Sequence, residues 1–386
     1  MSLFLDRNCY FKDFEMSIKD KLLTMSWSFF FLICCVVGIG IMLLYSVAGG
    51  SMEPWAAKQF FRFMMGCCVF FTILLIDLRF WMKYAYVFYA ISLLLLIAVD
   101  IRGVVGMGAQ RWLDLGFMQL QPSELMKINL VLALARYFHG SGEEDVERTT
   151  HLIIPTVMMA LPVGLILVQP DLGTASMLVF VTVAIFFLVG VQWWKFALVG
   201  AAGLAAIPIG WHFLHDYQRQ RVLTFLDPER DPLGAGYHIM QSKITLGSGG
   251  LFGKGFLEGT QSHLNFIPEK HTDFIFTVLS EEFGLIGSSL LLILYMAIIL
   301  LGFRMALKSS NFFGKILALG LIVNFSLYVF INTAMVMGLL PVVGVPLPLV
   351  SYGGSAMMVL MAGFGFIECV YVNQEMVIGR LGSSDE

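Results

Sequence analysis

Long, nearly uncharged stretches of apolar residues alternate along this chain with short polar segments. A helix needs about 20 such residues to cross the apolar core of a bilayer. The pattern therefore predicts an all-α polytopic integral membrane protein with ten transmembrane helices. The expected spans are residues 27–47, 59–77, 80–99, 122–138, 151–168, 174–193, 195–214, 274–302, 312–337 and 349–372.

Basic side chains interrupt two of these stretches, Arg62 in the second and Lys127 in the fourth. Composition supports a membrane protein all the same, because 58% of the residues are hydrophobic and only 13% are charged. A soluble domain carries about 25% charged residues to cover its surface. The net charge of −3 and the lack of a basic tract give no indication of a nucleic-acid partner.

An even number of spans places both termini on one side of the membrane. Basic residues in the short loops and terminal segments concentrate on that side, which is typical of the cytoplasm. The N-terminal segment 1–26 is therefore expected to be cytoplasmic, and residues 1–386 form a single membrane domain. The opposite side receives the largest loop, residues 215–273.

This extracytoplasmic loop departs from the charge pattern, because it is rich in basic residues. At about 60 residues it is long enough for the charge rule to weaken, and clustered cations there favour binding of an anion. The basic residues are Arg219, Arg221, Arg230, Lys243, Lys254 and Lys270. Its glycine-rich stretch 247–255 is compatible either with backbone N–H groups wrapped around phosphate or with an ordinary flexible loop.

Asp273 lies where this loop ends and an uncharged helix begins. An ionisable side chain at the edge of the apolar core is a candidate functional residue. The alternative is that Thr272 or Asp273 only caps the helix that follows. Glu281 and Glu282 lie about 12 Å further along that helix, where a structural pairing with a buried cation is expected.

Pro122 and Glu124 occupy the expected first turn of the fourth span, and Lys127 follows Glu124 by three positions, on the same face. These two charges can form a local ion pair, or Lys127 can meet an anionic ligand with help from Arg111. Asp171 is expected to cap the sixth span. The proline-rich segment 341–355 predicts a broken helix lining a cavity, which Asn332 would also face.

Several blocks together resemble one family, the SEDS proteins of cell shape, division and sporulation, of the RodA, FtsW and SpoVE types. The blocks are Gln121–Lys127, Gln169–Thr174, Asn265–Phe276 and Pro346–Ser355. Ala109–Gly116 and Gly253–Ser262 are most similar to the rod-shape (RodA) branch. The resemblance implies ten helices and a peptidoglycan glycosyltransferase that polymerises lipid II during lateral cell-wall elongation.

The resemblance places the essential aspartate of the family at Asp273. An acidic position of some division-type members is Asn265 here, so a mechanism with a second carboxylate at that point is not supported. Asp273 would act as general base on the acceptor GlcNAc 4-hydroxyl, and undecaprenyl pyrophosphate would leave. Candidate substrate-binding residues are Arg219, Arg221, Lys127, Glu124, Arg111, Lys243, Lys254, His271 and Ser351.

No cofactor is certain from the sequence. A divalent cation, Mg²⁺ or Mn²⁺, could help to stabilise the leaving pyrophosphate, but no metal ligands can be named. Expected partners are lipid II, a class B penicillin-binding transpeptidase and the elongation proteins MreC, MreD, RodZ and MreB. The implied location is the bacterial inner membrane, with the active site on the periplasmic face.

Other functions fit the same pattern. Ten spans with broken helices and intramembrane charges also suit a flippase that transports lipid II. A scaffold without chemistry of its own is a further alternative, as is a division-type septal polymerase within the same family.

Overall fold

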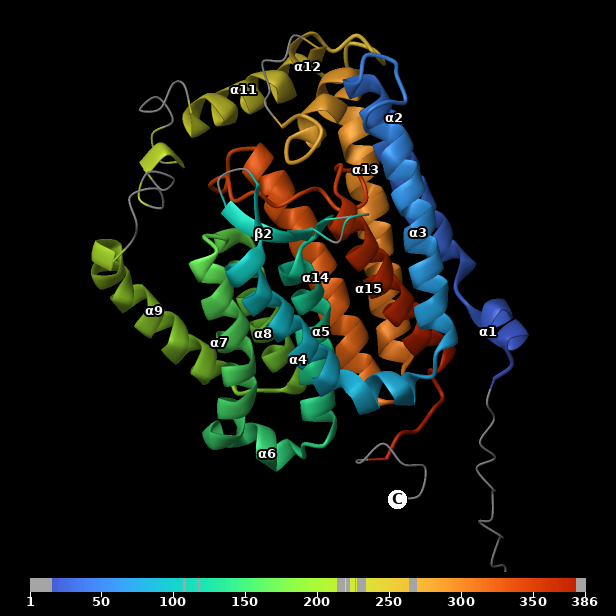
Figure 1. Ribbon diagram of the computed structural model, residues 1–386, viewed down its shortest axis with the longest axis vertical. Coiled ribbons are helices and arrows are strands. Elements are labelled where there is room, and N and C mark those ends of the chain that lie inside the picture. Colours follow the sequence, from blue (N-terminus) through green and yellow to red (C-terminus); the bar gives the residue numbers. More distant parts are fainter. Residues whose placement is uncertain are drawn as a thin grey trace, which may run out of the picture.

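The computed structural model describes residues 16–106, 109–114, 116, 119–213, 219, 223–225, 227, 234–263 and 269–379. Helices dominate this part of the chain (Figure 1). A helix occurs at each of the ten predicted ranges. These are α2 Trp27–Val47, α3 Ala56–Leu75, α4 Leu78–Arg102, α5 Pro122–His139, α7 Ile153–Val168, α8 Leu172–Val189, α9 Trp193–Phe213, α13 Ile275–Lys308, α14 Phe312–Val336 and α15 Gly354–Val372.

Eight helical segments in the described residues are long and apolar enough to cross a membrane. The two remaining helices are α5, which carries Glu124, Lys127 and Arg136, and α9, whose apolar part Trp193–Ala206 is shorter. The multi-pass architecture is therefore confirmed, whereas the number of ten crossings stays a prediction.

The connections contain short elements of their own. The helical ones are α1 Ile18–Thr24, α6 Glu143–Glu147, η1 Thr149–Leu152, α11 Ala235–Ser248 and α12 Thr260–His263. A small antiparallel sheet, in the order β1-β2-β3, lies in the loop before α5. Its strands are β1 Val104–Gly106, β2 Ala109–Asp114 and β3 Gln119–Leu120. The sequence pattern did not predict these strands.

Helices α14 and α15 form the centre of the bundle, with α2 and α3 on one side and α4, α5, α7 and α8 on the other (Figure 1). Glycines permit a close contact between α3 and α15. A Cβ atom at Gly66 would lie 2.8 Å from Met361 Cγ, and one at Gly365 would lie 2.8 Å from Phe70 O. One face of α3 therefore runs directly along α15.

The predicted helix break before the last span is confirmed. Residues 341–353 form no regular helix, and α15 begins only at Gly354, after the expected position 349. Pro346 and Pro348 explain the delay, because proline lacks the N–H that a helix interior requires. Gly344 has a φ of 73°, a conformation that glycine adopts at little cost.

Helix α13 is also broken, at Gly284, which has φ 64° and ψ −159°. The glycine-rich stretch 247–255 fills this break. The N–H groups of Lys254 and Gly255 donate to Glu281 O and Glu282 O at 2.9 and 3.0 Å. In return, Leu285 N and Ile286 N donate to the carbonyl oxygens of residues 250 and 251. The backbone groups that the kink frees are thus satisfied by the loop.

Candidate active site

The segment that ends at Asp273 is held by hydrogen bonds to three consecutive backbone carbonyls. Tyr352 N donates to His271 O at 2.9 Å, and Ser351 Oγ donates to Thr272 O at 2.6 Å. Asn332 Nδ2 donates to Asp273 O at 2.9 Å. The donors come from α14 and from the broken segment before α15, so these two elements together fix the position of Asp273.

The donors are themselves held in place. Ser351 Oγ accepts a hydrogen bond from Leu347 N at 2.8 Å, and its backbone carbonyl accepts one from Gln59 Nε2 at 3.0 Å. Asn332 Nδ2 also donates to Val345 O at 2.7 Å. Gln59 and Asn332 are fully buried. Helix α3, helix α14 and residues 345–351 therefore form one rigid support under Asp273.

The carboxylate of Asp273 does not cap α13. The N-cap residue is Phe274, and no side chain caps the helix there. Within the described residues the Asp273 carboxylate makes no hydrogen bond. A Cβ atom built on Gly344 would lie 3.7 Å from Asp273 Oδ2, so the missing side chain leaves room beside the acid. The alternative of a simple capping residue is therefore wrong.

Burial raises the pKa of Asp273 to about 6, and the nearby Glu269 carboxylate adds to the shift. A carboxylate in this range can take up a proton near neutral pH. Burial also lowers the pKa of His271, which favours its neutral form. The His271 ring stacks on Trp55, with 4.8 Å between the ring centroids and 17° between their planes.

Glu124 and Lys127 form the local ion pair that their spacing predicts, with Lys127 Nζ 2.6 Å from Glu124 Oε1. The sequence did not reveal the third member of this cluster, Tyr328 of α14. Its hydroxyl accepts from Lys127 Nζ and donates to Glu124 Oε2. All three residues are buried, at most 4% exposed. The charge of Lys127 is thus neutralised inside the bundle.

Tyr328 and Asn332 are four residues apart on α14, on one helix face. Tyr328 holds the Glu124–Lys127 pair, and Asn332 holds the backbone of Asp273. A small pocket next to Tyr328 is lined by residues 346–349, Ser351 and Gly353. Two polar residues at helical spacing, in the part of α14 that carries no charge after Lys315, were the available sequence signal for this arrangement.

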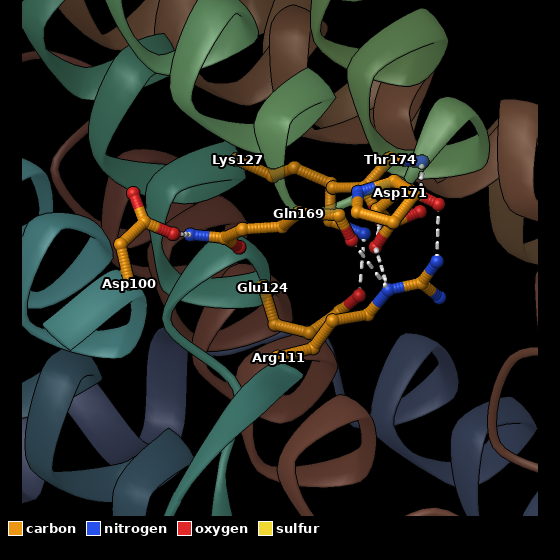
Figure 2. A network of polar contacts seen from close by, with 8 residues as sticks. Asp100, Arg111, Glu124, Lys127, Gln169, Asp171 and Thr174 are labelled. Carbon is orange, nitrogen blue, oxygen red and sulfur yellow. Dashed lines mark hydrogen bonds and ion pairs between the residues drawn. The ribbon is translucent and has the colours of Figure 1, made fainter. Parts of the chain in front are cut away.

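Arg111 of β2 lies beside Glu124 and Lys127 (Figure 2). Its Nε donates to Gln169 O at 3.1 Å and its Nη2 donates to Pro170 O. Asp171 Oδ2 lies 4.0 Å from Arg111 Nε. Asp171 caps α8 as predicted, because its side chain accepts from Thr174 N at 3.1 Å. Arg111 therefore holds the Gln169–Asp171 turn.

Lys254 pairs with the buried Glu281, with 2.7 Å between Nζ and Oε1. Gln261 N donates to the same carboxylate oxygen at 2.8 Å. A Cβ atom at Gly249 or Gly253 would overlap a carbonyl oxygen of α13. The glycine-rich stretch is therefore packed against α13, and the N–H groups of residues 253–255 are engaged within the protein.

The other predicted binding residues are not brought to Asp273 by any observed contact. Lys243 is exposed on α11, and Arg219 is half-buried. Arg221 lies outside the described residues, as do Arg230 and Asn265. In the described part of the chain no group of three or more His, Cys, Asp and Glu side chains could hold a metal ion. The divalent cation therefore stays a prediction.

Comparisons with known proteins show the family of the chain. A family model described as cell cycle protein, for FtsW, RodA and SpoVE, matches residues 20–376. Peptidoglycan glycosyltransferase MrdB of Escherichia coli K12 is 46% identical over 340 residues, 87% of this chain and 90% of that protein. Stage V sporulation protein E of Bacillus subtilis is 32% identical over 339 residues, 85% of this chain and 92% of that protein.

Solved structures share the fold. A chain from "Structural coordination of polymerization and crosslinking by a peptidoglycan synthase complex" has a TM-score of 0.79 at 33% identity. The match covers 91% of this chain and 98% of the chain in that structure. The rod shape determining protein RodA of Thermus thermophilus has a TM-score of 0.69 at 29% identity, with 91% and 98% covered.

Proposed function

The chain belongs to the FtsW, RodA and SpoVE family of cell cycle proteins, and from this premise we propose how it makes glycan strands. It is a multi-pass membrane enzyme, a peptidoglycan glycosyltransferase. The proposed substrate is lipid II, used during lateral cell-wall elongation. A donor that is activated in advance suits a chain without a nucleotide-binding motif.

Asp273 is the proposed general base. The observation that carries this assignment is that its backbone is fixed by Asn332 while its carboxylate stays uncommitted within the described residues. A pKa of about 6 lets the carboxylate be ionised at neutral pH and still accept a proton. The fixed backbone holds it in one position, which favours reaction with a bound hydroxyl.

The reaction is a displacement at C1 of the donor MurNAc. The acceptor 4-hydroxyl oxygen forms the new glycosidic bond, and its proton passes to Asp273. The bond between C1 and the pyrophosphate oxygen breaks, and the electron pair leaves with undecaprenyl pyrophosphate. No general acid is needed, because pyrophosphate is a good leaving group, but its growing negative charge requires stabilisation.

The proposed setting follows from the family. The active site would face the periplasm with both termini in the cytoplasm. A class B penicillin-binding transpeptidase would crosslink the new strands, together with MreC, MreD, RodZ and MreB. The similarity to a chain from a peptidoglycan synthase complex supports a partner of this kind.

Turnover of lipid II by the purified protein tests the proposal. The Asp273→Ala variant should fold and insert into the membrane but form glycan strands at about 10²–10⁴-fold lower rate. Asp114→Ala removes an exposed carboxylate from β2 and serves as the control with unchanged rate. Full polymerisation by Asp273→Ala would eliminate the mechanism. Lipid II translocation without polymerisation would favour the flippase instead.

A further inference from the structure

Arg62 is a half-buried basic side chain of α3 that has no acidic partner among the described residues. It follows Ala56, the first residue of α3, by six positions, which is about 9 Å along the helix axis. It forms no salt bridge within the described residues, and its buried Nη1 has no hydrogen-bond partner there. A guanidinium has five N–H donors. A cation at this depth normally faces an anion or a polar cavity.

The surroundings of Arg62 hold its guanidinium in a defined place. Its Cζ lies 4.3 Å from the centroid of the Tyr352 ring. A Cβ atom at Gly354 would lie 3.2 Å from Arg62 Nε and 3.3 Å from Cζ. The guanidinium is therefore stacked on an aromatic ring and packed against the backbone at the start of α15. That helix start has no side-chain cap, so its positive end adds to the charge of Arg62.

The same contacts connect Arg62 to the Asp273 segment. Tyr352, under the guanidinium, donates its N–H to His271 O at 2.9 Å. The rings of Tyr352 and His271 have centroids 6.1 Å apart. Trp55, Gln59 and Arg62 share one face of α3, and each contacts this segment or the turn that holds it. An anion bound by Arg62 would lie on the α3 side of the proposed active site.

Three other basic candidates are already neutralised or hydrogen-bonded. Lys127 pairs with Glu124, and Lys254 pairs with Glu281. Arg111 donates to the carbonyl oxygens of Gln169 and Pro170. By contrast, the buried Nη1 of Arg62 finds no acceptor within the described chain. The site therefore has a cation available on the α3 side.

We propose that Arg62 binds the pyrophosphate of the polyprenyl-linked donor. This inference rests on the proposed function and assigns one contact within it. A planar guanidinium can hold two phosphate oxygens at once through charge-assisted hydrogen bonds. As the C1–O bond breaks, negative charge grows on the departing pyrophosphate oxygen, and Arg62 stabilises that charge. The hydroxyl proton still passes to Asp273.

The experiment measures binding without turnover. The Asp273→Asn protein is placed in phosphatidylcholine nanodiscs and titrated with undecaprenyl pyrophosphate. Adding Arg62→Gln should weaken binding about 10- to 100-fold, the range of a lost charge-assisted hydrogen bond. Arg62→Lys, which keeps the charge but not the planar fork, should give an intermediate loss. Arg102→Gln, an exposed arginine in the last turn of α4, is the matched control and should bind normally.

Phosphatidylglycerol is the competing source of a lipid phosphate, and a second titration with this lipid separates the two. The proposal predicts that it competes poorly. Equal affinity of the parent and Arg62→Gln proteins would overturn the assignment, as would displacement of the pyrophosphate lipid by an equal concentration of phosphatidylglycerol. If Arg62→Gln does not fold, the affinity of the Arg62→Lys protein for undecaprenyl pyrophosphate is compared with that of the parent protein. Equal affinity would then overturn the assignment. The turnover assay of the Asp273→Ala protein tests the general base separately and does not depend on either titration.

Discussion

Two polar clusters on neighbouring turns of α14 differ in how fully their hydrogen bonds are satisfied. Tyr328 completes a buried triad in which Glu124 and Lys127 both have partners. Asn332, one turn further on, holds the backbone of Asp273 and of Val345, and the carboxylate of Asp273 stays without a partner in the described chain. The paired charges of Glu124 and Lys127 stabilise the bundle. The carboxylate of Asp273, on a fixed backbone, can instead interact with a substrate.

Removing Lys127 should give the largest effect on stability. Lys127→Met leaves Glu124 buried without its cation, which typically costs about 3–5 kcal/mol. A lower midpoint of thermal unfolding of the purified protein measures this loss. The double variant Glu124→Gln with Lys127→Met should recover most of it. A Lys127→Met protein of normal stability that does not bind lipid II would instead support a substrate-binding role for Lys127.

Removing Asn332 should affect activity more than stability. Asn332→Ala deletes the donor to Asp273 O and Val345 O, so the general base loses its fixed position. Displacement by about 1 Å can cost about 10²-fold in rate. Glycan strand formation from lipid II gives the rate. Asn324→Ala, a buried asparagine two turns earlier on α14, is the control. Equal losses in both variants would indicate a general packing defect.

Neutralising Glu269 should produce the smallest change, seen only in the pH profile. The ionised form of Asp273 is the active base, so activity should fall as the pH drops through about 6. The negative charge of Glu269 raises the pKa of Asp273, and Glu269→Gln should therefore move this acidic limb to lower pH. Glu144→Gln changes an exposed carboxylate on α6 and should leave the profile in place. If the acidic limb of the Glu269→Gln profile stays in place, the group that titrates there is not Asp273.

Features with short sequence separation could be predicted. The apolar ranges gave the helices, the prolines gave the break before α15, and local spacing gave both the Glu124–Lys127 pair and the Asp171 cap. The support of Asp273 could not be predicted, because its donors lie 59 to 81 positions away along the chain. The role of Tyr328 was equally hidden, since 204 positions separate it from Glu124.

The break at Gly284 has a mechanical consequence for the molecule. The 247–255 segment is joined by backbone hydrogen bonds to both sides of the break, to Glu281 and Glu282 before Gly284 and to Leu285 and Ile286 after it. The segment therefore holds the short helical piece that follows Asp273 at a fixed angle to the long remainder of α13. A change that displaces the 247–255 segment would release this angle and shift the proposed base.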